Sequence, residues 1–231
     1  MTELAFGIAA YAACGPNPGD TFDLWPAPDT PRPPVPLLLR RRVGPIGQAV
    51  SRAAWAMPHL DRARYVFASR HGEFDRTLTM LENVADNDGP SPADFSLGVH
   101  NALAGLLSVA TKNRRGHTAI AAGIDSFGFG LMEAAACVLE QPDEPVVLAY
   151  YDAGLPPGYP DTAPSQAETT LALALAIVSR RQASRHVVMA ATPATAEPGE
   201  AAAAVFLRFL RATAAEATAS GERMTWRWRH V

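Results

Sequence analysis

The chain has 231 residues, of which 48% are hydrophobic and 19% charged, and its formal net charge is −3. This balance is typical of a soluble globular protein with one large core. It excludes a disordered chain and gives no electrostatic footprint for nucleic acid. Every apolar run is far shorter than the roughly 20 residues that span a bilayer, and the N-terminal run lacks the Lys or Arg of a signal peptide. We therefore expect a cytoplasmic protein with no membrane partner and a single domain over residues 1–231.

In the first half of the chain, apolar periodicity and Gly/Pro punctuation predict strands that alternate with helices. A strand is expected at 4–15, a stiff proline-rich loop at 26–36, a helix at 44–57, a strand at 63–72, and helices at 74–86 and 94–111. Six prolines in the eleven positions of the loop exclude a helix or a central strand there.

The second half continues the alternation. We expect a strand, a turn and a helix within 117–140, a buried strand at 144–152, a Pro/Gly-rich loop at 153–166, a strand within 169–181, a helix at 199–219 and a short strand at 223–231. Leucines alternate with alanines in the strand within 169–181, so its alanine face should lie under a helix. In the last strand, Trp226 and Trp228 share one side, which is typical of a half-buried edge strand. The whole pattern predicts a layered α/β fold.

The segment "HTAIAAGIDSFGFGLMEAAACVLE" (117–140) has the outline of a nucleophile elbow, in which a strand enters a tight turn before a helix. No cysteine stands at the turn, and Ser126 lacks the flanking glycines of a G-x-S-x-G motif. We interpret Asp125 or Ser126 as the N-cap of the helix, accepting a backbone N–H near Phe129.

Other candidates for chemistry are weaker. The six histidines and two cysteines show no metal-ligand spacing, so neither a metal nor a cofactor is expected. His71, at a strand end, is the histidine placed most like an active-site residue. Gly128 and Gly130 lack the pattern of a nucleotide-binding loop and are expected to allow close helix packing. Cys137 is expected to be a small core residue, and Arg40 to Arg42 the solvated start of a helix.

Several segments, taken in order, carry a family resemblance. They are "LAFGIAAYAACGPNPGDTFDLW" (4–25), "RRRVGPIGQAVSRAAWAM" (40–57), "ARYVFASRHGEFD" (63–75), "SLGVHNALAGLLSVATKNRRGHTAIAAGIDSFGFG" (96–130) and "EPVVLAYYD" (144–152). Over roughly 4–178, their order resembles the N-terminal half of the β-ketoacyl synthases. The resemblance implies a thiolase-like layered fold, a mixed sheet with helices on both faces.

The chain departs from this family at the nucleophile. Aligned without gaps from Gly116, the position of the synthases' catalytic cysteine falls on Asp125, and a two-residue slip places it on Gly123 instead. Neither residue can attack a thioester as a thiolate does. The synthases' two catalytic histidines lie in their C-terminal half, and this chain has about half the length of such an enzyme. The resemblance therefore implies a pseudoenzyme, although the sequence leaves its enzymatic status open.

Catalytically inactive relatives of the synthases are known as chain length factors. This sequence looks most like the short ones of aryl polyene pathways. That likeness implies a heterodimer with a full-length type II β-ketoacyl-ACP synthase, and contact with acyl carrier protein as a further possibility. The interface would comprise Asn101, His117, Ala119 and Ala121, and Phe127, Phe129 or Met132 would stop the growing chain or else belong to the core.

Two alternatives belong to other classes. One is a small acyl hydrolase or acyltransferase that uses Ser126 with a histidine such as His71 or His100. The other is a self-associating half-thiolase with an unrelated binding role.

Overall fold

The computed structural model describes residues 3–15, 17, 19–27, 33–155, 159, 170–212 and 214–231. Its strands are β1 (Glu3–Cys14), β2 (Asp23–Trp25), β3 (Arg64–Ala68), β4 (His117–Ile120), β5 (Val146–Asp152), β6 (Leu171–Val178), β7 (Arg185–Pro193), β8 (Glu216–Ser220) and β9 (Met224–His230). Its helices are α1 (Leu37–Arg41), α2 (Pro45–Trp55), α3 (Phe74–Ala85), α4 (Pro92–Leu97), α5 (Ala102–Thr111), α6 (Ser126–Glu140) and α7 (Ala202–Arg211), and the 3-10 turn η2 covers Arg180–Gln182.

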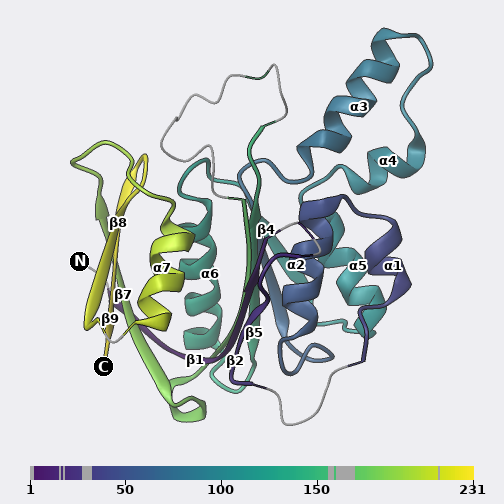
Figure 1. Cartoon of the computed structure of the whole chain (residues 1–231). Coiled ribbons are helices and arrows are strands. Elements are labelled where there is room, and N and C mark those ends of the chain that lie inside the picture. Colours follow the sequence, from purple (N-terminus) through teal and green to yellow (C-terminus); the bar gives the residue numbers. More distant parts are fainter. Residues whose placement is uncertain are drawn as a thin grey trace.

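The strands form one mixed sheet in the order β4-β3-β5-β6-β1-β7-β9-β8, with β2 paired to β1. Strand β3 is parallel to both of its neighbours, β4 and β5, and the remaining pairs are antiparallel. Figure 1 shows helices on both faces, with α6 and α7 on one side and α1, α2 and α5 on the other. The predicted layered α/β architecture is therefore confirmed.

Each face of the sheet has its own hydrophobic core. Strand β6 divides its side chains between them: Leu173, Leu175 and Ile177 join the α6/α7 core, whereas its alanines join the α2 core. Small side chains on β6 and on α2 allow the helix to lie close to the sheet, as the alternation in the sequence predicted.

Strand β1 connects the two ends of the sheet. Its first half pairs with β7, and its second half pairs with β6 on one side and β2 on the other. Gly7 lies at the point of divergence, and a Cβ there would come within 2.6 Å of the Ala183 Cβ. A glycine is therefore required where the chain crosses so closely.

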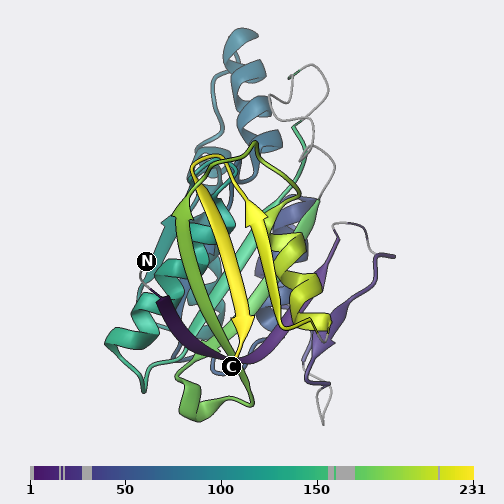
Figure 2. The ribbon, with the colours of Figure 1, turned by 90° about the vertical axis from the view of Figure 1, so that its left-hand side faces the viewer.

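The C-terminal region corrects two predictions. The helix expected at 199–219 ends at Arg211, because Glu216–Ser220 pairs with β9 as strand β8. Strand β9 is flanked by β7 and β8, so it is not an edge strand, and Trp226 and Trp228 are completely buried. The sequence analysis expected no helix or strand at the residues that form β7. In Figure 2 these three strands lie in front, with no described helix over them.

The helix expected at 94–111 is divided into α4 and α5 around Gly98. Helices α3 and α4 form a hairpin that projects from the body in Figure 1, and neither contains a buried residue. Arg76 ties this hairpin together and to the body, because it pairs with Glu73 and with Asp94 on α4 and donates to the backbone oxygen of Arg42.

The arginine run corrects another expectation, since Arg40 and Arg41 lie in the last turn of α1 and not at a helix start. The expected proline-rich loop at 26–36 is described only at 26–27 and 33–36, and most of the expected loop at 153–166 lies outside the described residues.

Candidate functional site

The elbow lies between β4 and α6, as predicted. Two backbone bonds close the turn, from the Asp125 N–H to the Ala122 oxygen at 3.2 Å and from the Ser126 N–H to the Gly123 oxygen at 3.2 Å. Gly123, one of the two positions considered for a nucleophile, has a left-handed backbone with a φ of +61°, which favours glycine. The other position, Asp125, directly precedes α6.

Asp125 is completely buried, and both of its carboxylate oxygens accept hydrogen bonds from the C-terminal hairpin β8–β9. The Trp226 indole N–H donates to Oδ1 at 2.9 Å, and the Arg223 backbone N–H donates to Oδ2 at 2.8 Å. Asp125 is the N-cap residue of α6, as predicted, but its side chain makes no cap hydrogen bond, so the predicted side-chain acceptor role is wrong. The Phe129 N–H bonds instead to the backbone oxygen of Asp125, which leaves the carboxylate for the hairpin donors.

Ser126 is also engaged. Its Oγ accepts from the Ala122 N–H at 2.9 Å and donates its proton to the Gly123 oxygen at 2.7 Å. The residue is 1% exposed. A serine nucleophile needs its proton directed toward a base and an open approach for substrate, and this hydroxyl has neither. The geometry therefore does not support the hydrolase hypothesis.

The two histidines considered with Ser126 lie after β3 and before α5. His71 lines a cavity of about 50 Å³ with Gly72 and Glu73 at the start of α3. His100 packs beside Gly72, and its Nε2 is buried without a hydrogen-bond partner among the described residues.

The aromatic side chains of α6 belong largely to the chain's own core. Phe127 is 1% exposed, and its ring centroid lies 5.4 Å from those of Tyr150 and Phe206. Phe129, whose ring meets Trp226 edge-on at 5.1 Å, and Met132 are only partly buried against the same core.

The glycines of α6 are packing residues, as predicted. A Cβ on Gly128 would lie 2.1 Å from the Trp226 ring, and one on Gly130 would lie 2.7 Å from the Ala68 Cβ.

Strand β4 forms one end of the sheet path, and β3 is its one partner among the described strands. His117 and Ala119 are exposed along it, and Ala121 is exposed directly after it. Helix α5 contacts β4 from one side, and helix α6 contacts β4 from the other. Both helices add exposed apolar groups, Val109 at 68% and Leu139 at 48%, and a Cβ on Gly105 of α5 would meet nothing within 4 Å. Asn101, at the start of α5, is also exposed.

The sequence analysis did not single out two carboxyl groups near the ends of β3 and β5, the buried Glu73 and the partly buried Asp152. Glu73 accepts the Gly44 N–H at 2.6 Å at the start of α2, and its burial raises its pKa. Burial also raises the pKa of Asp152 to about 6. An acidic residue at the end of an apolar strand or shortly after it was the available signal, in "VLAYYD" and "VFASRHGE".

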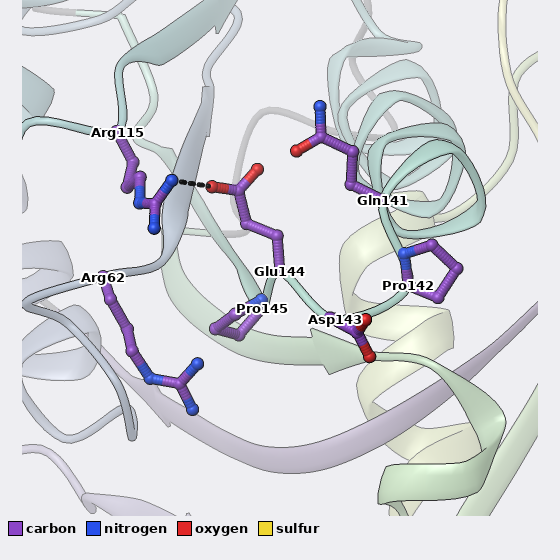
Figure 3. A pocket seen from close by; sticks show the side chains of 7 residues that line it. All are labelled: Arg62, Arg115, Gln141, Pro142, Asp143, Glu144 and Pro145. Carbon is purple, nitrogen blue, oxygen red and sulfur yellow. Dashed lines mark ion pairs between the residues drawn. The ribbon is translucent and has the colours of Figure 1, made fainter.

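A larger cavity, of about 260 Å³, lies at the opposite ends of β3 and β5 from the elbow. Figure 3 shows Arg62 and Arg115 facing the loop between α6 and β5, and Arg115 pairs with Glu144 at 3.5 Å. Asp143 and Glu144 balance the two guanidinium charges around it.

Within the part of the chain that the structure describes, no three His, Cys, Asp or Glu residues gather as metal ligands. Cys14 and Cys137 are both free and buried. None of the described helices has the length and apolar character to cross a membrane.

Residues 20–229 match the family model for the N-terminal domain of β-ketoacyl synthases. The chain belongs to this family. The match continues past residue 178 through β7, α7, β8 and β9, so the family resemblance extends further than the segments singled out in the sequence. No curated protein sequence matches the chain.

Solved structures agree with this β-ketoacyl synthase fold. A chain in the complex of a ketosynthase (ApeO) with its chain length factor (ApeC) from Xenorhabdus doucetiae is 23% identical with a TM-score of 0.76, and the match covers 98% of this chain and 99% of that one. A chain in a type II polyketide synthase complex of ketosynthase and acyl-carrier protein (AntDE:AntF) is 13% identical with a TM-score of 0.56. The match covers 84% of this chain and 70% of that one. The ishigamide ketosynthase/chain length factor is 15% identical with a TM-score of 0.50, and the match covers 85% of this chain and 66% of that one.

Proposed function

We propose that this chain is a non-catalytic subunit, of the chain-length-factor kind, that pairs with an active type II β-ketoacyl-ACP synthase. The observation that carries the proposal is the elbow. Gly123 has no side chain, and both oxygens of buried Asp125 are occupied by hydrogen bonds. Neither of the two alignments with the synthases therefore places a nucleophile for acyl transfer at the elbow.

The solved structures support the same proposal. The ApeO–ApeC match covers nearly all of both chains, so that chain has about the length of this one. Both the ApeO–ApeC structure and the ishigamide structure combine a ketosynthase with a chain length factor. We place this chain in a cytoplasmic pathway of the aryl polyene or a related polyketide or fatty-acid-like type.

The proposed interface is the β4 edge with the flanking surfaces of α5 and α6. An unpaired strand edge presents backbone N–H and C=O groups that a partner strand can bond, and native proteins usually cover or blunt such edges. Asn101, His117, Ala119 and Ala121 lie on this exposed surface. Val109 and Leu139 add apolar area on either side. Covering this surface would stabilise the partner synthase and complete its acyl pocket.

The three candidate chain stoppers differ in burial. Phe127 is enclosed by the chain's own aromatic residues, so we propose Phe129 and Met132, which are only partly buried, as the side chains nearest to the partner's pocket.

The experiment that tests the proposal is affinity purification of the tagged chain from its native host, followed by mass spectrometry of the proteins that co-purify. We expect a full-length ketosynthase in equal amount. Recovery of a soluble, monomeric chain with no synthase would contradict the proposal and favour an unrelated binding role.

A further inference from the structure

The tight turn of the C-terminal hairpin lies directly on the elbow. Its residues 221–226 are named the C-terminal plug here. The Gly221 N–H bonds to the Met224 oxygen at 2.8 Å and closes the turn. Besides the two hydrogen bonds to Asp125, the Arg223 guanidinium donates to the Ala122 oxygen at 3.0 Å and lies 5.7 Å from the centre of the Phe129 ring.

No free volume separates the plug from the elbow. A Cβ added to Gly221 would lie 1.8 Å from the Asp125 Oδ1, and the Trp226 ring occupies the space that a side chain at position 128 would need. The plug also lies close to Gly123, since a Cβ on that residue would lie 3.1 Å from the Glu222 carboxylate. Three glycines, Gly123, Gly128 and Gly221, and a buried carboxylate thus allow the plug to pack tightly on the elbow and the start of α6.

We infer that the C-terminal plug closes the elbow to acyl thioesters and that Asp125 is its buried hydrogen-bond acceptor, acting together with the packing of Trp226 on Gly128. An aspartate at this position then has a structural role of its own, because it is the acceptor for both donors of the plug. A cysteine restored at position 125 would lie beneath the Trp226 indole and the Arg223 backbone, where no thioester could reach it. This inference deepens the proposed function. It rests on that function only for the statement that the acyl chain grows on the partner synthase.

The test replaces Asp125 with cysteine in the full-length chain and measures alkylation by iodoacetamide under native conditions. Glu222→Cys is the matched control, because Glu222 is an exposed residue of the plug itself. Cys14 and Cys137 are buried, and peptide mass spectrometry separates their signals from the introduced thiol. The packing of the Trp226 ring against Gly128 and the Arg223 bond to the Ala122 oxygen remain in this variant, so the plug stays seated when the carboxylate is removed. We expect the Asp125→Cys thiol to react roughly 100-fold or more slowly than the Glu222→Cys thiol, since it reacts only when the plug opens. Rates within a few-fold of each other would overturn the inference.

A measurement on the unmodified chain guards against misfolding of the Asp125→Cys variant. The Trp226 indole N–H, followed by NMR in deuterated water, should exchange slowly because it is bonded to a buried carboxylate. Exchange at the rate of a free indole would show an open elbow and refute the closed plug. Neither measurement needs the synthase, so failure to find a partner and failure of the plug are separate results.

Discussion

Trp226 and Trp228 are both completely buried on β9, yet their indole N–H groups meet different surroundings. The Trp226 N–H donates to the Asp125 carboxylate, whereas the Trp228 N–H has no partner among the described residues. Hydrogen bonds to charged groups contribute about 1.5–3 kcal/mol, whereas an unpaired buried donor costs about 1–3 kcal/mol of desolvation.

Replacing each tryptophan with phenylalanine therefore provides a matched pair. Both variants lose similar apolar area, but only Trp226→Phe leaves a buried carboxylate oxygen without its donor. We expect Trp226→Phe to lower the free energy of unfolding by about 2 kcal/mol more than Trp228→Phe does, measured by urea denaturation. Equal losses would show that the Asp125 bond contributes nothing to stability.

Asp152 gives the chain a predicted pH dependence. Its pKa is raised from 3.8 to about 6, mainly because burial disfavours the charged carboxylate. Below about pH 4 both the folded and unfolded states hold the proton, and the group has no effect on stability. Between about pH 4 and 6 only the folded state keeps the proton, so stability falls as pH rises. Above pH 6 the full penalty, roughly 3 kcal/mol, is present.

Asp152→Asn removes this titration and retains an acceptor for the Tyr150 hydroxyl. We expect the variant to match the wild type near pH 4 and to exceed its free energy of unfolding by roughly 2–3 kcal/mol at pH 7.5. Urea denaturation at the two pH values makes the comparison. An unchanged pH profile would mean that Asp152 is not the group responsible.

At the scale of single elements, α5 presents a glycine toward open space at the proposed interface. A Cβ at position 105 would meet nothing within 4 Å, and either Ala or Leu raises helix propensity by about 0.5–1 kcal/mol. Both Gly105→Ala and Gly105→Leu should therefore stabilise the isolated chain slightly.

Only the larger side chain should interfere with a partner. Overpacking a close helix contact costs about 1–3 kcal/mol, so we expect Gly105→Leu to weaken the complex with the synthase roughly 10- to 100-fold, and Gly105→Ala to leave it within a few-fold. Co-purification with the tagged synthase, in competition with the wild type, measures the difference. A Gly105→Leu chain that competes equally would place the interface elsewhere.

The elements also show which features of the fold are local. Strands such as β5 and β6 and helices such as α2 and α3 were predictable, because an apolar run or a helical period defines each within a few residues. Strand β8 was not, since "EATAS" has ordinary helix propensity and becomes a strand by pairing with β9. The elbow itself was visible in the sequence, but the donors to Asp125 are 98 and 101 residues away, and no local pattern could reveal them.

For the molecule as a whole, one sheet connects both cores. Strand β1 pairs with β7 at one end and with β6 at the other, and its side chains enter the α6/α7 core and the α2 core alternately. The plug adds a second connection, because it bonds the last hairpin to the turn after β4, at the far end of the sheet path. Neither core can lose its strands without exposing the other.

The chain should therefore unfold as a single domain. We expect one cooperative thermal transition, with the calorimetric enthalpy equal to the van't Hoff enthalpy and with tryptophan fluorescence and far-UV circular dichroism changing together. Two of the four tryptophans, Trp226 and Trp228, lie in the C-terminal hairpin and contribute their part of the fluorescence change, whereas circular dichroism reports on helices distributed over both faces. If the hairpin were an independent unit, fluorescence would change first and the helices would persist. Because the plug is anchored at Asp125, such an early transition would also mean that the elbow opens before the fold is lost.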